Sequence, residues 1–173
     1  MNIYKRFIVN VLANSQWIPI QIRTKLYNWM GIRTNQSEIR PGCFFNSEFV
    51  NIGTKSFINF YSQFHSGYDE RGVITLGERC YIGMNVNFCT ISHELGDSSQ
   101  RAGKNTYEPI TVGNGTWIGA NSIILPGVEI AEGCVIAAGS VVTKDCEANS
   151  LYAGNPARKI KDLPHPNLKV SNS

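Results

Sequence analysis

The chain has 173 residues, of which 42% are hydrophobic and 17% are charged, and its formal net charge is +3. This length corresponds to one domain, and the composition is that of a globular rather than a disordered protein. The small charge, without basic residues interleaved with aromatic ones, excludes a nucleic-acid-binding signature. No apolar run approaches the roughly 20 residues of a membrane span, and no cleavage site follows residues 3–12, so we expect a cytoplasmic protein.

The N-terminal segment, residues 1–36, has the pattern of two short amphipathic helices. Pro19 lies near the start of the second helix and Gly31 ends it. We predict that both helices form a cap on the rest of the fold. Their apolar stripes consist of Ile3, Tyr4, Phe7, Ile8, Val11 and Leu12 in the first helix and of Ile22, Leu26, Tyr27 and Met30 in the second.

The same segment is basic throughout. Residues 1–34 carry five Lys or Arg residues and no acidic residue, and they include Trp17 and Trp29. Basic amphipathic helices bind anionic membrane surfaces, and tryptophan suits such an interface. A peripheral contact with the inner face of the membrane is therefore the alternative to a purely structural cap.

Residues 37–155 carry a six-residue repeat. Three hexads close one triangular turn of a parallel β-helix, and stacked turns bury the apolar positions. The second hexad position holds Gly or Ala, which suits a tight corner. The inward positions are Ile39, Phe45, Ile52, Ile58, Phe64, Leu76, Ile82, Phe88, Val112, Ile118, Ile124, Ile130, Ile136, Val142 and Ala148. The small corner residues are Gly53, Gly77, Gly83, Gly113, Gly119, Ala131 and Ala137.

Two polar, glycine-bearing stretches interrupt the repeat. They are residues 65–73 and residues 93–109, and we predict that both are loops extruded from corners of the coil. Loops that a rigid scaffold holds are frequent places for functional residues.

The cysteines follow the repeat. Cys43, Cys80, Cys134 and Cys146 each lie four residues after an inward position, where a small buried side chain is expected. The chain has an odd number of cysteines and no CxxC pair, which argues against a disulfide framework and a zinc site. We interpret these thiols as structural.

The C-terminal segment, residues 156–173, begins after the repeat ends. We expect a short basic turn or helix at residues 158–163 and a frayed polar tail that contains His165.

His93 is the candidate catalytic residue. It lies at the start of the longer interruption, and the chain has only three histidines. A neutral imidazole near pH 7 is suited to act as a general base.

The repeat, the segment Ser92–Gly96, the stretch from Pro109 to Asp145 and the motif Ala153–Ile160 resemble the hexapeptide-repeat acetyltransferases. The similarity covers residues 39–162 and is greatest to the maltose, galactoside and nodulation O-acetyltransferase branch and to capsule or exopolysaccharide O-acetyltransferases. It implies a left-handed parallel β-helix, an acetyl-CoA co-substrate, no metal, a homotrimer and a role of His93 as general base.

The resemblance also assigns binding residues. The predicted coenzyme residues are Gly119, Ala120, Ala138, Thr143, Lys144, Arg158 and Lys161, the small ones beside the pantetheine arm and the others near the adenine and phosphates. The predicted acceptor residues are Asn59, Asp69 and Trp117. The chain departs from the sugar acetyltransferases between Asn59 and Leu76. Its N-terminal segment also lacks the maltose acetyltransferase pattern, which favours a polysaccharide or lipid-linked glycan as acceptor over a free disaccharide.

Three other functions fit parts of the pattern. The same base could N-acetylate an amino sugar or nucleotide sugar. A γ-type carbonic anhydrase needs three histidines for zinc, and His165 lies outside the repeat. A structural or ice-binding β-helix shows outward threonine rows, which this sequence lacks.

Overall fold

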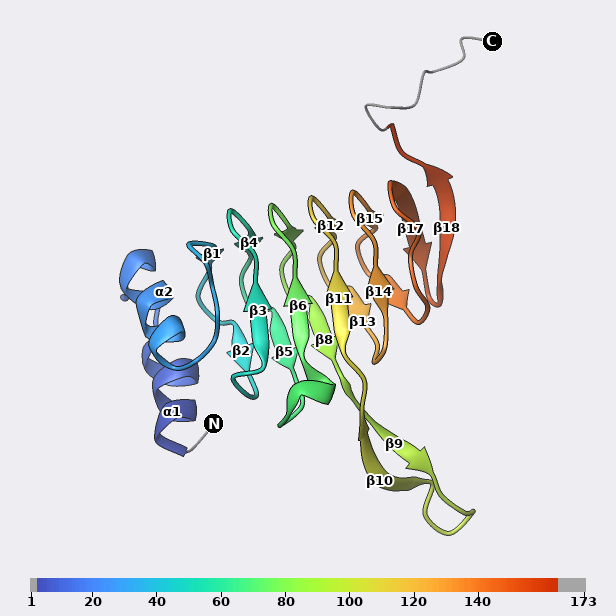
Figure 1. Ribbon diagram of the computed structural model, residues 1–173, viewed down its shortest axis with the longest axis horizontal. Helices are drawn as coiled ribbons and strands as arrows, with labels where there is room; N and C mark the ends of the chain where they lie inside the picture. The colour runs from blue at the N-terminus through green and yellow to red at the C-terminus, as the bar shows by residue number, and fades with distance from the viewer. Residues whose placement is uncertain (1–2, 165–173) are drawn as a thin grey trace.

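The computed structural model describes residues 3–164 and shows the predicted parallel β-helix (Figure 1). Short strands of successive coils pair in parallel and form three flat sheets, which we call faces A, B and C; the chain begins on face B and then visits faces C, A and B in turn. The corners between them are called A/B, B/C and C/A.

The strands have the following bounds. Face A contains β3 (Val50–Ile52), β6 (Ile74–Leu76), β11 (Ile110–Val112) and β14 (Glu129–Ile130). Face B contains β1 (Glu38–Ile39), β4 (Phe57–Ile58), β7 (Tyr81–Ile82), β12 (Trp117–Ile118), β15 (Val135–Ile136) and β17 (Ser150–Gly154). Face C contains β2 (Phe44–Phe45), β5 (Gln63–His65), β8 (Asn87–Cys89), β13 (Ile123–Ile124) and β16 (Val141–Val142).

The core follows the predicted hexad register. The inward positions from Ile39 to Val142 are almost fully buried, and aromatic rings stack where Phe45, Phe64 and Phe88 follow one another on face C. The prediction was wrong for Ala148, which is exposed. The last coil is incomplete there, and Tyr152 of β17 covers the end of the core.

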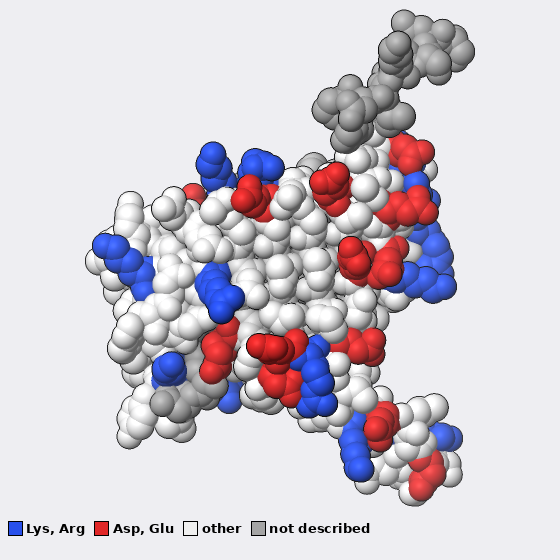
Figure 2. Space-filling view, viewed as in Figure 1, with Lys and Arg blue, Asp and Glu red and all other residues white. Residues whose placement is uncertain are grey.

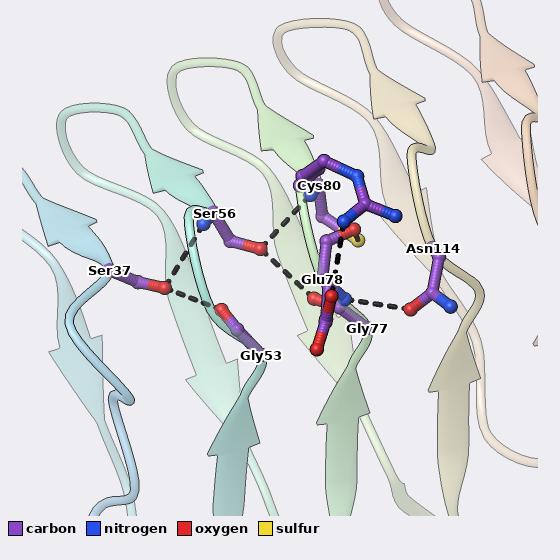
Figure 3. A network of polar contacts seen from close by, with 8 residues as sticks. Ser37, Gly53, Ser56, Gly77, Glu78, Cys80 and Asn114 are labelled. Carbon is purple, nitrogen blue, oxygen red and sulfur yellow. Dashed lines mark hydrogen bonds and ion pairs between the residues drawn. The ribbon is translucent and has the colours of Figure 1, made fainter.

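The small residues that follow the inward positions join the coils by hydrogen bonds. At the A/B corner the Ser56 hydroxyl donates to the carbonyl of Gly77 at 2.9 Å and accepts the amide of Cys80 at 3.0 Å (Figure 3). The Cys80 thiol continues the series to the carbonyl of Gly113 at 3.3 Å. These cysteines therefore take the place of serine in a polar ladder.

The glycines at the second hexad position are required by close packing between coils. An added Cβ on Gly113 would lie 2.4 Å from the amide nitrogen of Glu132, and one on Gly53 would lie 2.4 Å from the backbone of Gly77. Positive φ angles occur two residues later, at Gly115 and Asn121 among others. The predicted tight corner is confirmed.

The N-terminal helices cap one end of the coil (Figure 1). They are α1 (Ile3–Phe7), which continues as a π-helical turn η1 (Ile8–Leu12), and α2 (Ile20–Trp29). Helix α2 packs against β1, η1 packs against β2, and the Tyr27 ring lies 5.0 Å from that of Phe45.

Of the apolar stripe that we predicted for the first helix, Ile8 packs against the core. Ile3, Phe7 and Val11 are exposed, whereas Val9 and Ala13 are buried against the coil. Small side chains allow the helix to approach closely. The buried Arg23 guanidinium ties the cap together by donating to the carbonyls of Ala13, Ser15, Ile18 and Ile39.

Two segments predicted as irregular form hairpins instead. Residues 93–109 belong to an antiparallel pair, β9 (Ile91–Leu95) and β10 (Ala102–Tyr107), which projects from the C/A corner. The basic segment is strand β18 (Ala157–Asp162), antiparallel to β17 and neither turn nor helix. In residues 65–73, His65 ends strand β5, and the 3₁₀ turn η2 (Glu70–Gly72) is the other regular element. His165 and the tail lie outside the described residues.

Candidate functional site

His93 lies on the projecting hairpin. It occupies β9, opposite Asn105 of β10, and its side chain is exposed. The last coil strand before it is β8, and strand β9, which carries the histidine, projects away from the coil wall (Figure 1).

The His93 ring is held by the backbone of the opposite strand. Its Nδ1 lies 3.0 Å from the carbonyl oxygen of Gly103, at an irregularity in register between Ala102 and Asn105. A carbonyl only accepts, so Nδ1 carries the proton and Nε2 of the neutral ring is left with a free lone pair. Glu94 does not orient the ring, in agreement with the alternation of side chains along a strand.

The loop at residues 65–73 packs against the base of this hairpin. The Thr90 hydroxyl donates to the carbonyls of His65 and Gly72, and the Arg71 guanidinium lies 5.8 Å from the centre of the Tyr107 ring. The structure therefore brings the loop that carries Asp69 to the same corner as His93.

Asp69 is engaged within its own loop. Its carboxylate accepts hydrogen bonds from the amide and the guanidinium of Arg71, with a shortest contact of 2.7 Å. These bonds lower the pKa of Asp69. The predicted acceptor residue is thus an ionised group that already binds an arginine.

Asn59 and Trp117 lie elsewhere on the surface. Asn59 is at the B/C corner, where its side-chain oxygen accepts the amide of Phe60 at 2.9 Å. Trp117 points outward from face B, is 54% exposed and lies between Tyr81 and Val135 of the adjacent coils. One chain alone does not gather the three predicted acceptor residues.

Three of the predicted coenzyme residues do come together. Gly119, Ala120 and Ala138 lie on adjacent coils at the B/C corner, where an added Cβ on Gly119 would lie 2.5 Å from the amide nitrogen of Ala138. The Gly119 amide donates to the carbonyl of Ile136 and is not available to a ligand. The Ala138 side chain is exposed.

The residues predicted to lie near the adenine and phosphates, Thr143 and three cations, are at the C-terminal end of the coil. Thr143 and Lys144 follow β16 at the C/A corner, while Arg158 pairs with Ala153 at the end of face B nearest the B/C corner. Lys161 pairs with Leu151, further from that corner. Within residues 3–164 no carboxylate forms an ion pair with these cations, whereas Lys159 contacts Glu147 and Asp162.

Outer faces A and B differ in character, a feature that our sequence analysis missed. Face A displays Asn51, Thr75, Thr111 and Glu129. Face B displays an apolar row that consists of Phe57, Tyr81, Trp117, Val135 and Leu151. The residue before each inward position points outward, so the character of each face could have been read from the sequence at those positions.

The buried thiols are not candidates for catalysis. Burial raises the pKa of Cys43 and of Cys146 to about 12 and also raises the pKa of Cys80 and Cys134. A protonated thiol is a poor nucleophile, which supports a structural role. Among residues 3–164, no group of three or more His, Cys, Asp or Glu side chains is placed to hold a metal ion.

Comparison with known proteins identifies relatives of this coil. Residues 109–144 match the family model of the bacterial transferase hexapeptide (six repeats). A galactoside O-acetyltransferase of Escherichia coli K12 is 37% identical over 105 residues, which are 61% of this chain and 52% of the relative. The chain spans between about half and three fifths of the length of the curated relatives that it matches.

Solved structures agree over most of the chain. A hexapeptide-repeat acetyltransferase of Vibrio cholerae, solved with acetyl coenzyme A, superposes with a TM-score of 0.80 at 28% identity and covers 94% of this chain and 87% of its own. A maltose O-acetyltransferase of Clostridium difficile 630 gives a TM-score of 0.77 at 28% identity over 94% and 86% of the two chains.

The chain belongs to the hexapeptide-repeat acetyltransferase family. Its fold is the left-handed parallel β-helix of that family, as the resemblance implied.

Proposed function

We propose that this protein is an acetyl-CoA-dependent O-acetyltransferase that acetylates a saccharide hydroxyl. The observation that carries the proposal is the contact between His93 Nδ1 and the Gly103 carbonyl, which leaves Nε2 as a proton acceptor on an exposed hairpin. The family and its acetyl-CoA-bound member support the donor.

The proposed reaction is a direct transfer. Nε2 of His93 takes the proton of the acceptor hydroxyl while its oxygen attacks the acetyl carbonyl. A backbone N–H of a neighbouring coil stabilises the tetrahedral oxyanion. The C–S bond then breaks, the coenzyme A sulfur leaves as thiolate, and the imidazolium returns the proton to it. No acyl-enzyme forms, in keeping with the raised pKa values of the buried thiols.

The surface suits the coenzyme at two places. Gly119, Ala120 and Ala138 provide a corner of small residues along which a pantetheine arm approaches the backbone, and the missing Cβ of Gly119 lets the two coils meet closely there. Thr143, Lys144 and Arg158 lie at the C-terminal end, where exposed cations suit phosphates. Lys161 is the weakest member of the set because β18 places it further from the small-residue corner.

We propose that a homotrimer completes the site. His93 is at the C/A corner and the small-residue corner is B/C, so one copy does not present both to one ligand. The apolar row on face B is a surface for a neighbouring copy, whereas face A is polar. A closed ring of three brings a hairpin of one chain toward the B/C corner of the next.

The proposed acceptor is a polysaccharide unit or a lipid-linked glycan precursor. Asn59 and Trp117 offer an amide and an aromatic face, and Asp69 takes part as the Asp69–Arg71 pair. Because acetyl-CoA is the proposed donor, we place the reaction in the cytoplasm.

An acceptor screen tests this function. Purified protein is incubated with acetyl-CoA and a panel of saccharides, including amino sugars and nucleotide amino sugars, and free thiol is measured. We expect saccharide-dependent thiol release with an ester product that mild alkali removes. An alkali-stable amide product would instead establish N-acetylation, and the absence of release with any saccharide would overturn the proposal.

A further inference from the structure

The helical cap is apolar on two sides. One side packs on the coil through Val9, Ala13, Tyr27 and Met30. Other apolar side chains of the cap face solvent: residues 3–29 carry eight of the sixteen exposed large hydrophobic side chains of the described chain. They are Ile3, Tyr4, Phe7, Val11, Leu12, Trp17, Ile22 and Trp29, and we call them the outer cap surface.

A helix that only closes a coil is expected to be polar on its outer side. In this cap Trp17 is 92% exposed, Ile3 is 79% exposed and Trp29 is 70% exposed. Such a concentration of exposed apolar side chains indicates an interaction surface.

The basic character of the cap favours an anionic partner. Between residues 3 and 37 there is no acidic residue, and the exposed Lys25 lies on α2 between Ile22 and Trp29 at helical spacing. Figure 2 shows blue and white atoms over the end of the molecule where the cap lies. Aromatic side chains beside cations match the interface of an anionic bilayer.

We propose that the outer cap surface docks the protein on an anionic lipid bilayer. None of the described helices is long and apolar enough to cross a membrane, so the cap lies on the surface. The cap is at one end of the coil, and Thr143, Lys144 and Arg158 are at the other (Figure 1). A docked protein therefore keeps the proposed coenzyme end in solution.

The position of the cap also favours a lipid-linked acceptor, an inference that rests on the proposed function. Asn59 follows β4, on the second coil from the cap. Docking thus brings Asn59, one of the three proposed acceptor residues, toward the bilayer, as a lipid-linked glycan requires.

Vesicle flotation with the full chain tests the docking. We expect the protein to float with vesicles that contain phosphatidylglycerol and to remain in the soluble fraction with phosphatidylcholine alone. The double variant Trp17→Ser/Trp29→Ser removes two exposed rings and lowers binding about tenfold or more. Lys25→Gln lowers binding about fivefold.

Matched controls alter similar side chains outside the cap. Tyr68→Ser/Leu95→Ser removes two other exposed apolar side chains, and Lys104→Gln removes a hairpin cation; both float like the wild type. If the wild type fails to float with anionic vesicles, or the cap variants float equally well, the proposal is overturned.

A second measurement separates a lipid partner from another copy of the chain. Light scattering is expected to give the same oligomer mass for the wild type and the double tryptophan variant. A smaller mass for the variant would assign the outer cap surface to subunit contact and overturn the docking. Thiol release with a water-soluble saccharide is independent of vesicles, so loss of docking leaves the proposed function standing.

Discussion

The buried thiol of Cys43 makes the stability of the coil depend on pH. It donates to the carbonyl of Asn59 at 3.3 Å, and burial raises its pKa to about 12 from an ordinary value of 9.0. The unfolded chain therefore loses this proton near pH 9, while the folded chain keeps it. The contribution to stability is complete below pH 9 and is lost as the pH rises toward 12.

This thiol gives a prediction about alkaline stability. Between pH 9 and pH 11 it contributes a fall in the free energy of unfolding of about 1.4 kcal/mol per pH unit. Cys43→Ser keeps a hydroxyl donor but does not titrate there, so the fall becomes shallower by about that amount. Denaturant unfolding over this pH range measures it. An unchanged slope in the serine variant would show that Cys43 does not carry the effect.

Single residues also mark where sequence prediction succeeded. Ile82 and Ile118 were placed in the core because the period of six on each side of residues 93–109 leaves only one inward register. The Gly103 carbonyl at His93 could not be predicted, since it depends on a bulge within β10. The identities of the residues in this segment do not indicate that contact.

At the scale of the element, each corner is set by how closely two coils approach. An added Cβ on Gly113 would meet the backbone of Ala131 and Glu132, whereas nothing lies within 4 Å of one on Gly115, whose φ is +68°. Glycine is therefore required at position 113 by close packing between coils, and it is favoured at position 115 by the positive φ angle.

A pair of substitutions separates these reasons. Gly113→Ala forces two coils apart, and we expect a loss of about 3 kcal/mol in the free energy of unfolding. Gly115→Asn is expected to cost less than about 1 kcal/mol, because asparagine tolerates positive φ and occupies the same corner position at Asn121. Chemical denaturation gives both values. Equal losses would contradict the close-packing account.

Helices and hairpins were harder to predict than coil strands. The first helix is apolar around most of its circumference, so its periodicity does not say that Val9 and Ala13 face inward. Residues 93–109 lack the alternation that identifies a strand, and backbone pairing alone makes them a hairpin. The segment that carries His93 was thus located correctly, but its form was not.

At the scale of the whole molecule, the difference between the outer faces of the coil is the basis of the proposed trimer. The apolar row of face B leaves Tyr81 and Trp117 more than half exposed in a single chain. Such a row is stabilised by a neighbouring subunit that covers it.

Charge placed on this face tests the proposed trimer. We expect Tyr81→Glu to convert a trimer into monomers and to reduce acetyl transfer, because a carboxylate at a covered apolar contact is strongly unfavourable. Thr111→Glu on polar face A is the matched control and leaves the oligomer intact. Light scattering reports the mass. A wild-type chain that is monomeric in solution would contradict the account of a shared site.

The most direct measurement compares thiol release by the wild type and His93→Ala, together with the dissociation constant for acetyl-CoA. Loss of the base is expected to lower turnover about 10²- to 10⁴-fold and to leave acetyl-CoA binding unchanged. Glu94→Gln, at the neighbouring exposed position, keeps most of the activity. Wild-type turnover in His93→Ala would contradict the proposal that this imidazole takes the proton of the acceptor.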